Sequence, residues 1–480
     1  MSVSTRRRFL GQSILAAAGL CASRLRMFAA RPGKNALLDG SAVQRLASAI
    51  SGRVITPDAS EYESARLVFN RAFDLHPAMI VRCANATDVA RTLEFAQTSR
   101  LPVAVRSGGH SRAGFSACDG GVVIDLSPMK RVDVDASRRV ARAGAGSLVG
   151  DMDAATMRFG LATPSGGCPN VGMAGFTLGG GEGLLMTMHG AGCDNLLTAH
   201  VVLVDGKEVE TSLESNPDLF WAIRGGGGNF GVVTGFEYRL HPVGNVLAGA
   251  LTYPPGRIAE LLNGFAKFNA SVPDEMVPLG ELLPAEQGPR FINHICYFGD
   301  ARTGNDLLRP LRTPLKPEHD DLRMMSYFDA QAAGFRPAPF AHFQSNVFLP
   351  KMSEAAVEVI TTAVNNGPPQ FRVLMVGFLG AITRVRANET AFALRQPGVE
   401  IDILGSWSTA AEKTDAVQWV KALRDSLRPF AHGVYVSQLG ETSDELVRAA
   451  YASNYGRLAQ IKRKYDPNNV LHRNQNIKPA

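Results

Sequence analysis

The chain has 480 residues, of which 45% are hydrophobic and 20% charged, and this length predicts two or three domains rather than one core. Its formal charge of +6 arises at the start, where residues 1–34 hold seven basic residues and no acid, so that the remaining chain carries −1. We therefore expect no nucleic-acid partner. No later apolar run approaches the eighteen or so residues that span a bilayer, which excludes a stable membrane span in the body of the protein.

The first 34 residues resemble a twin-arginine export signal. Arg6, Arg7 and Arg8 precede an apolar, alanine-rich stretch at residues 14–20. An uncleaved basic amphipathic start or a membrane anchor is the alternative. The interpretation predicts a periplasmic or secreted protein with the twin-arginine translocase as a transient partner.

Residues 70–243 have the pattern of an α+β domain. Strand composition at residues 78–82 is followed by a helix from Thr87 to Gln97 and a second strand at residues 102–106. Three further β-branched or alternating runs occupy residues 122–126, 131–134 and 139–143. Strands and helices are thus interleaved at the start of the domain and strands dominate afterwards.

Glycine is concentrated in this region, in blocks at residues 107–109, 165–167, 178–181 and 224–228. Each block adjoins a strand or helix pattern, so flexible loops alone explain them poorly. Glycine is needed where the backbone adopts positive φ or approaches another group closely. The blocks therefore indicate a large, phosphate-containing cofactor.

One apparent nucleotide motif is rejected. Residues 226–231 read GGGNFG and match the G-x-G-x-x-G fingerprint, but that fingerprint must follow a strand and open a helix. Here the pattern predicts a helix over residues 218–223 and a strand over residues 232–238. A Rossmann dinucleotide site is not expected.

Around residue 245 the glycine blocks cease and proline becomes frequent. Residues 246–430 alternate strand-like runs, such as residues 373–379, with helices at residues 353–365 and 410–428. This alternation predicts a substrate domain in which helices cover one face of a sheet. A C-terminal segment, residues 431–480, contains a strand-like run at residues 434–439 and a helix at residues 444–464.

The six cysteines form no C-x-x-C pair, and one of them, Cys21, lies within the export signal. Neither a zinc site nor a disulfide framework is predicted, and we expect no metal. Most of these cysteines are expected to be buried thiols.

Five phrases of the chain are informative when taken together. They are residues 106–111 (RSGGHS), 166–172 (GGCPNVG), 178–183 (LGGGEG), 218–231, and the ending 465–477 with YDPNNV and NQNI. Jointly they resemble the berberine bridge enzyme-like flavoproteins of the vanillyl-alcohol oxidase superfamily, over residues 70–480. The resemblance implies a two-part PCMH-type FAD-binding domain, a substrate domain with an antiparallel sheet covered by helices on one face, and a C-terminal segment that closes onto the FAD domain.

The resemblance also implies a bicovalent FAD, bonded by His110 to its 8α-methyl group and by Cys168 to C6. A loop histidine hydrogen-bonded to backbone and a buried thiol are the alternatives for each residue taken alone. Val171 would control the access of O2 to the flavin, and a residue this small favours an oxidase over a dehydrogenase. The other residues expected at the cofactor are Arg106, Ser107, Gly108, Gly109, Ser111, Gly172, Gly179, Gly180, Gly183, Asn195, Gly231, Val232, Val233, Asn474 and Gln475.

The catalytic base is where the match to the family weakens. Related oxidases often place a tyrosine where this chain has Gln438, and an amide does not titrate. Gln438 is therefore expected to orient the substrate. Tyr435 and Tyr455 are nearby phenols, but strand alternation over residues 434–439 would put Tyr435 on the opposite face, and Tyr455 is expected to pack the terminal helix. The companion strand at residues 373–380 is apolar.

The sequence thus predicts an FAD-dependent oxidase of an alcohol or amine carbon in a small carbohydrate or secondary metabolite, with O2 as acceptor and H2O2 as product. The apolar strand slightly favours a hydrophobic substrate. A dehydrogenase with another acceptor is one alternative, and a catalytically weakened flavin-binding protein is the other.

Overall fold

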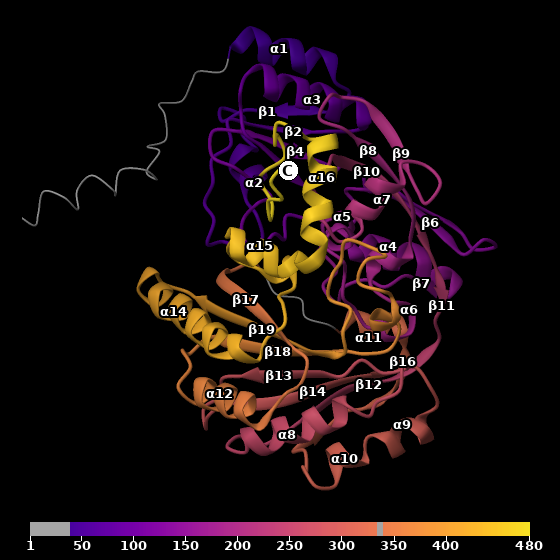
Figure 1. Cartoon of the computed structure of the whole chain (residues 1–480), viewed down its shortest axis with the longest axis vertical. Helices are drawn as coiled ribbons and strands as arrows, with labels where there is room; N and C mark the ends of the chain where they lie inside the picture. Colours follow the sequence, from indigo (N-terminus) through magenta and orange to yellow (C-terminus); the bar gives the residue numbers. More distant parts are fainter. Residues whose placement is uncertain (1–38, 334–338) are drawn as a thin grey trace, which may run out of the picture. The chain divides into compact units, whose positions relative to one another are not determined.

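The computed structural model describes residues 39–333 and 339–480, so the predicted export signal lies outside the described residues. Residues 45–480 form one compact unit. The fold is of the α+β class, as predicted, and contains three main sheets (Figure 1). No helix of the described residues is both long enough and apolar enough to cross a membrane.

The first sheet has the order β1-β2-β4-β3, with β2, β4 and β3 parallel and β1 antiparallel to β2. The predicted helix is present as α3 (Ala86–Thr98), although its N-cap is Asn85, whose side chain accepts from the Asp88 N–H. The strands are β1 (Arg53–Ile55), β2 (Met79–Arg82), β3 (Val103–Arg106) and β4 (Val122–Asp125); helices α1 (Gly40–Ala49) and α2 (Tyr62–Arg66) belong to the same part of the sequence.

The second sheet is antiparallel and has the order β5-β6-β10-β8-β9. Helix α7 (Pro217–Ile223) precedes the glycine block at residues 225–228, and β10 (Val232–Arg239) follows it. This order confirms that the GGGNFG phrase is no dinucleotide fingerprint. The other elements are β5 (Val132–Asp135), β6 (Val140–Gly144), β8 (Leu196–Val202), β9 (Glu208–Thr211), α4 (Val149–Thr156), α5 (Met173–Leu178), α6 (Met186–His189), and the two-stranded ribbon of β7 (Leu161–Ala162) with β11 (His241–Pro242).

The third sheet, the substrate sheet, has eight strands, and all of its pairings are antiparallel. Its order is β15 (His319–Asp320), β12 (Asn245–Thr252), β14 (Arg290–Tyr297), β13 (Leu279–Leu283), β18 (Phe371–Phe378), β19 (Gly398–Trp407) and β17 (Ala341–Leu349), and β16 (Arg323–Ser326) pairs with β12. Helices α8 (Ile258–Asn269), α12 (Glu354–Asn365) and α14 (Ala410–Leu427) lie together along one side of it (Figure 1).

Alternation along these strands separates a core face from a cavity face. On β18, Val373 and Met375 belong to the core beneath the helices, whereas Leu374 and Val376 line the cavity. On β19, Ile401 belongs to the same core, while its neighbours on either side line the cavity. The helices therefore cover one face of the substrate sheet, and the other face is available for a site.

The remaining helices are short or lie near the C-terminus. They are α9 (Ala301–Leu307), α10 (Arg309–Arg312), α11 (Tyr327–Ala332), α13 (Ala381–Arg384), α15 (Asp444–Tyr451) and α16 (Tyr455–Tyr465). The strand expected at residues 434–439 is absent from the described structure. A single 3-10 turn, η4 (Val436–Gln438), occupies its place.

Candidate active site

A cavity of about 900 Å³ lies between the glycine-rich turns and the open face of the substrate sheet. Its lining includes residues 107–112, 166–168, 227–229 and 231–233 on one side, and residues from β12, β13, β14, β18 and β19 on the other. The size is that of a site for a large ligand. The four glycine blocks contribute much of the first of these sides, which we call the first wall, and the strands form the opposite side, the sheet wall.

Two glycine-rich turns cross at van der Waals distance on this wall. A Cβ atom on Gly108 would lie 2.3 Å from the Gly172 nitrogen, and one on Gly172 would lie 2.4 Å from the Gly108 nitrogen. Only glycine permits that approach. The crossing places the 107–111 turn and the 168–172 turn side by side, and their side chains share the cavity.

His110 and Cys168 meet at this crossing. The Cys168 thiol donates to Asn170 Oδ1 at 2.8 Å, and the His110 ring also hydrogen-bonds to the Asn170 side chain. Phe69 stacks on the His110 ring with 4.0 Å between centroids. Burial, helped by the charge of Arg112, lowers the pKa of His110 to about 4. The imidazole is therefore neutral at pH 7, and Cys168 is only partly buried.

Most of the residues predicted at the cofactor line this cavity. They are Ser107, Gly108, Gly109, His110, Ser111, Cys168, Val171, Gly172, Gly179, Gly183, Gly231, Val232, Val233, Asn474 and Gln475. The amide nitrogen of Asn474 donates to Gly228 O and Leu471 O, and that of Gln475 donates to Glu441 O. Their side-chain oxygens, like the Tyr451 hydroxyl, are buried and find no partner among the described residues.

Three residues that were predicted to lie at the cofactor do not line this cavity. Arg106 is buried, forms an ion pair with Asp125 at 2.8 Å and donates to the Ala65 carbonyl, and it lines a smaller neighbouring cavity. Gly180 packs under the Phe392 ring, where a Cβ would lie 2.6 Å away. Asn195 donates to the carbonyls of His189 and Ala191, which makes it part of the framework behind the wall.

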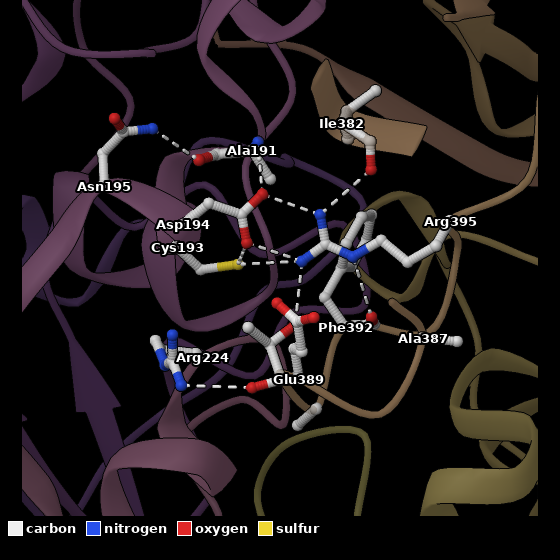
Figure 2. A network of polar contacts seen from close by, with 12 residues as sticks. Ala191, Cys193, Asp194, Asn195, Arg224, Ile382, Ala387, Glu389, Phe392 and Arg395 are labelled. Atoms are coloured by element: carbon white, nitrogen blue, oxygen red, sulfur yellow. Dashed lines mark hydrogen bonds and ion pairs between the residues drawn. The ribbon is translucent and has the colours of Figure 1, made fainter. Parts of the chain in front are cut away.

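A buried ion pair fixes the loop that contains Phe392 (Figure 2). Arg395 pairs with Asp194 through both terminal nitrogens, at 2.6 and 2.7 Å, and its side chain is 2% exposed. The loop crosses Gly225, where a Cβ would lie 2.3 Å from the Phe392 nitrogen. Phe392 in turn packs edge-on against Tyr435, with 5.8 Å between ring centroids.

A second buried ion pair holds the C-terminal segment against the same wall. Lys462 and Asp466 are fully buried and 2.6 Å apart. Lys462 also donates to the carbonyls of Asn229 and Leu471, at 2.8 and 3.0 Å. Asp466 is the acid of the YDPNNV phrase, and its carboxylate accepts two backbone N–H groups as well. That phrase therefore positions residues 471–475 at the cavity.

The substrate sheet contributes acids that the sequence analysis missed. Glu400 and Asp402 are both buried and lie on the cavity face of β19, and Glu182, half-buried, faces them from the turn after α5. Asp402 accepts from Gln344 Nε2 at 2.7 and 2.8 Å. Burial raises the pKa of Asp402 to about 6, against the opposing effects of Arg112 and Gln344. The alternation of acid and apolar residues at 399–403 is the signal that would have identified this face.

Tyr435 and Gln438 both line the cavity, so the prediction that they face opposite ways was wrong. The 3-10 turn replaces strand alternation between them. The Tyr435 hydroxyl accepts from the Gly181 N–H at 3.0 Å, and burial raises its pKa well above the usual value, which disfavours it as a base. The Gln438 side-chain oxygen accepts from Gln344 at 2.7 Å and from Arg112 at 3.3 Å.

The outer part of the substrate sheet is more polar than the strand at 373–379 suggested. Leu374 and Val376 do line the cavity, but Arg372 precedes them and contacts Glu281. His294 hydrogen-bonds to the same carboxylate at 2.7 Å. Burial opposes ionisation of Glu281, yet His294 and Arg372 together lower its pKa to about 2. The slight preference for a hydrophobic substrate is not supported by this wall.

Comparisons with known proteins agree with the geometry. The family model described as FAD binding domain matches residues 77–212, and that described as Berberine and berberine like matches residues 434–478. The FAD-linked oxidoreductase YgaK of Bacillus subtilis is 32% identical over 444 residues, covering 90% of this chain and 97% of the relative. The (R)-6-hydroxynicotine oxidase of Paenarthrobacter nicotinovorans is 30% identical over 448 residues, covering 90% and 97%. The crystal structure of 6-hydroxy-D-nicotine oxidase from Arthrobacter nicotinovorans superposes with a TM-score of 0.82 at 27% identity, covering 90% of this chain and 98% of that one.

Proposed function

Because the chain belongs to the berberine bridge enzyme-like family of FAD-linked oxidoreductases, we propose that it is an oxidase whose FAD is attached to both His110 and Cys168. Its substrate is a small organic molecule that is oxidised at an alcohol or amine carbon, with O2 as acceptor and H2O2 as product. The observation that carries the proposal is one cavity in which His110 and Cys168 meet at Asn170 while Asp402 lines the sheet wall.

The residues at the first wall fit FAD. The 107–111 turn lines the cavity with glycine-rich backbone of the kind that binds a pyrophosphate, and Gly108 and Gly172 add no side chain at their crossing. A neutral His110 has a ring nitrogen free to bond to carbon, and the partly exposed Cys168 is accessible to the same ligand. These features support attachment at two points.

The chemistry that bound FAD supplies is acceptance of a hydride from the substrate carbon and, in an oxidase, transfer of two electrons to O2. Asp402 takes the proton of the substrate hydroxyl or ammonium group. Its pKa of about 6 leaves it ionised at pH 7, close to the ideal for a general base. Gln344 holds the carboxylate, and Gln438, whose oxygen is occupied, has its amide N–H groups to orient the substrate.

Val171 tests the oxidase assignment, because it lines the cavity beside Cys168. We expect Val171→Leu to slow reoxidation of the reduced enzyme by air at least tenfold, since the added methylene fills space that O2 needs. The rate of anaerobic reduction by substrate, measured by stopped-flow absorbance, should change little. Val171→Ala is the control, because it makes the side chain smaller instead of larger. Equal loss of both half-reactions would show that Val171 shapes the substrate site instead.

The alternatives separate in simple assays. Peroxide formation under air, in a screen of alcohols and amines that includes hydroxylated nicotine analogues and oligosaccharides, distinguishes an oxidase from a dehydrogenase. Bleaching of the flavin by substrate distinguishes a dehydrogenase from a weakened flavin-binding protein. Asp402, as the proposed base, favours an active enzyme over the weakened flavin-binding protein.

The export signal remains a proposal, based on Arg6, Arg7 and the apolar stretch that follows. If the twin-arginine translocase recognises this segment, Arg6→Lys together with Arg7→Lys should retain the protein in the cytoplasm. Fractionation with antibody detection measures this, and unchanged export of the variant would refute the assignment.

A further inference from the structure

Two acids of the cavity face each other without a cation between them. Glu182 follows Gly180 and Gly181, whose φ angles are +120° and +93°, and precedes Gly183, where a Cβ would lie 1.9 Å from the Ser165 carbonyl oxygen. This turn cannot easily shift, so it fixes the direction of the Glu182 side chain. Glu400 on β19 is 0% exposed, and its carboxyl group lies close enough to that of Glu182 for each to act on the other.

Such a contact requires a proton on the pair. Both carboxyl oxygens of Glu400 and Oε1 of Glu182 are inaccessible to solvent, and no N–H or hydroxyl group of the described residues donates to them. Two carboxylates in this position would repel each other and lose their hydration. Burial accordingly raises the pKa of Glu182 to about 8 and raises that of Glu400 well above its usual value.

The other charged and titratable groups around the pair do not neutralise it. Asp402, on the same strand face as Glu400, adds a further negative charge. The Tyr435 hydroxyl is engaged with the Gly181 N–H. The positive charges of Arg112 and Arg372 act on Asp402. The pair is therefore stable in this buried position only when it carries a proton.

One oxygen of the pair is accessible from the cavity. Glu182 lines the cavity and is only half-buried, although its Oε1 is fully enclosed. The carboxyl oxygen that remains is thus the accessible one. A carboxylic acid held neutral by its surroundings can donate a hydrogen bond that a carboxylate cannot.

We propose that Glu182 and Glu400 form a protonated carboxyl pair that presents Glu182 as a hydrogen-bond donor to an acceptor atom of the bound ligand. Asp402, which lies on the same strand face as Glu400, is then the ionised acid beside the pair at neutral pH, and proton acceptor and proton donor are separate groups. The protonation of the pair is a property of the folded chain alone, whereas its effect on turnover rests on the proposed function.

The first test needs no substrate. A group whose pKa is raised in the folded chain stabilises the fold below its unfolded pKa, and that stability is lost as pH rises through the folded pKa. For Glu182 this window runs from 4.5 to about 8. The melting temperature of the holoenzyme should therefore fall across this range. Glu182→Gln should make this decline shallower, because the variant lacks the group at which the folded chain binds about one proton more than the unfolded chain.

Glu281→Gln is the matched control, because Glu281 lines the same cavity but has a pKa of about 2 and stays ionised throughout the window. It should keep the wild-type slope. Glu400→Gln should behave as Glu182→Gln does, and it replaces that variant if the latter fails to fold. A wild-type slope in both variants would overturn the protonated pair.

The second test is the pH profile of kcat/KM. In the wild type it should decline above a pH of about 8, approaching tenfold per unit, because the donor is lost. Glu182→Gln keeps an N–H donor that does not ionise, so it should lose this alkaline decline and retain the acidic decline near 6. A variant that flattens the stability slope but keeps the alkaline decline would overturn the donor role. Absence of any turnover would contradict the proposed function and leave the stability test to decide the pair.

Discussion

Asp402→Asn should lower kcat/KM by roughly 10²- to 10⁴-fold, the range that a positioned general base contributes. The amide keeps the size of the side chain and its contact with Gln344 but cannot take a proton. The wild type should lose activity as pH falls below about 6, because Asp402 becomes protonated there. The variant should show no such acidic limb. Steady-state kinetics from pH 5 to 9 measure both effects.

Gln438→Leu is the control for this experiment. It removes a neighbouring polar group that shares Gln344 with Asp402 but has no ionisation of its own. We expect it to lower kcat/KM by about 10- to 100-fold, roughly 1.4 to 2.7 kcal/mol, and to keep the acidic limb. If Asp402→Asn also kept the limb, or stayed within a fewfold of the wild type, the base would have to be sought elsewhere in the cavity.

Replacement of both His110 and Cys168 by alanine should release all of the flavin when the chain is denatured, whereas the wild type should keep its flavin. Covalent bonds survive unfolding, so acid-precipitated wild type should remain yellow. His110→Ala and Cys168→Ala should each keep the flavin through the other bond, and only the double variant should lose it. Absorbance of pellet and supernatant, with peptide mass spectrometry, provides the measurement.

Cys296→Ala is the matched control, because Cys296 is a second thiol on the cavity lining but belongs to β14 on the sheet wall. It should retain the flavin in full. Complete release from Cys168→Ala alone would show that His110 is not a covalent ligand. The hydrogen bond of His110 to Asn170 would then account for its position.

The sequence predicted the residues of the first wall better than those of the sheet wall. Glycine-rich turns are short-range features, and their clustering indicated a close backbone approach, which the crossing of Gly108 and Gly172 confirms. The α+β class and the helix-covered sheet were also confirmed. Asn195 shows the limit of this reasoning, because its side chain donates to the His189 and Ala191 carbonyls behind the wall and does not line the cavity.

The acids were missed because their role depends on pairing between distant strands. Glu400 and Asp402 look like ordinary strand residues until β19 pairs with β18 and turns one face toward the glycine-rich turns. Glu182 is 218 residues away from Glu400 along the chain, so no local pattern joins them. Tyr435 and Gln438 were misplaced for a simpler reason: residues 434–439 read VYVSQL, which has the composition of a strand, yet the chain turns there.

The reaction of the reduced enzyme with air shows whether this cavity supports an FAD-dependent oxidase. The purified full chain would be reduced anaerobically with dithionite and mixed with aerated buffer, while flavin absorbance and peroxide are followed. We predict that the reduced enzyme is reoxidised rapidly and completely, with H2O2 equimolar to flavin. In Val171→Leu this reoxidation should be at least tenfold slower. Slow reoxidation by air together with rapid reoxidation by an artificial quinone acceptor would contradict it and identify a dehydrogenase.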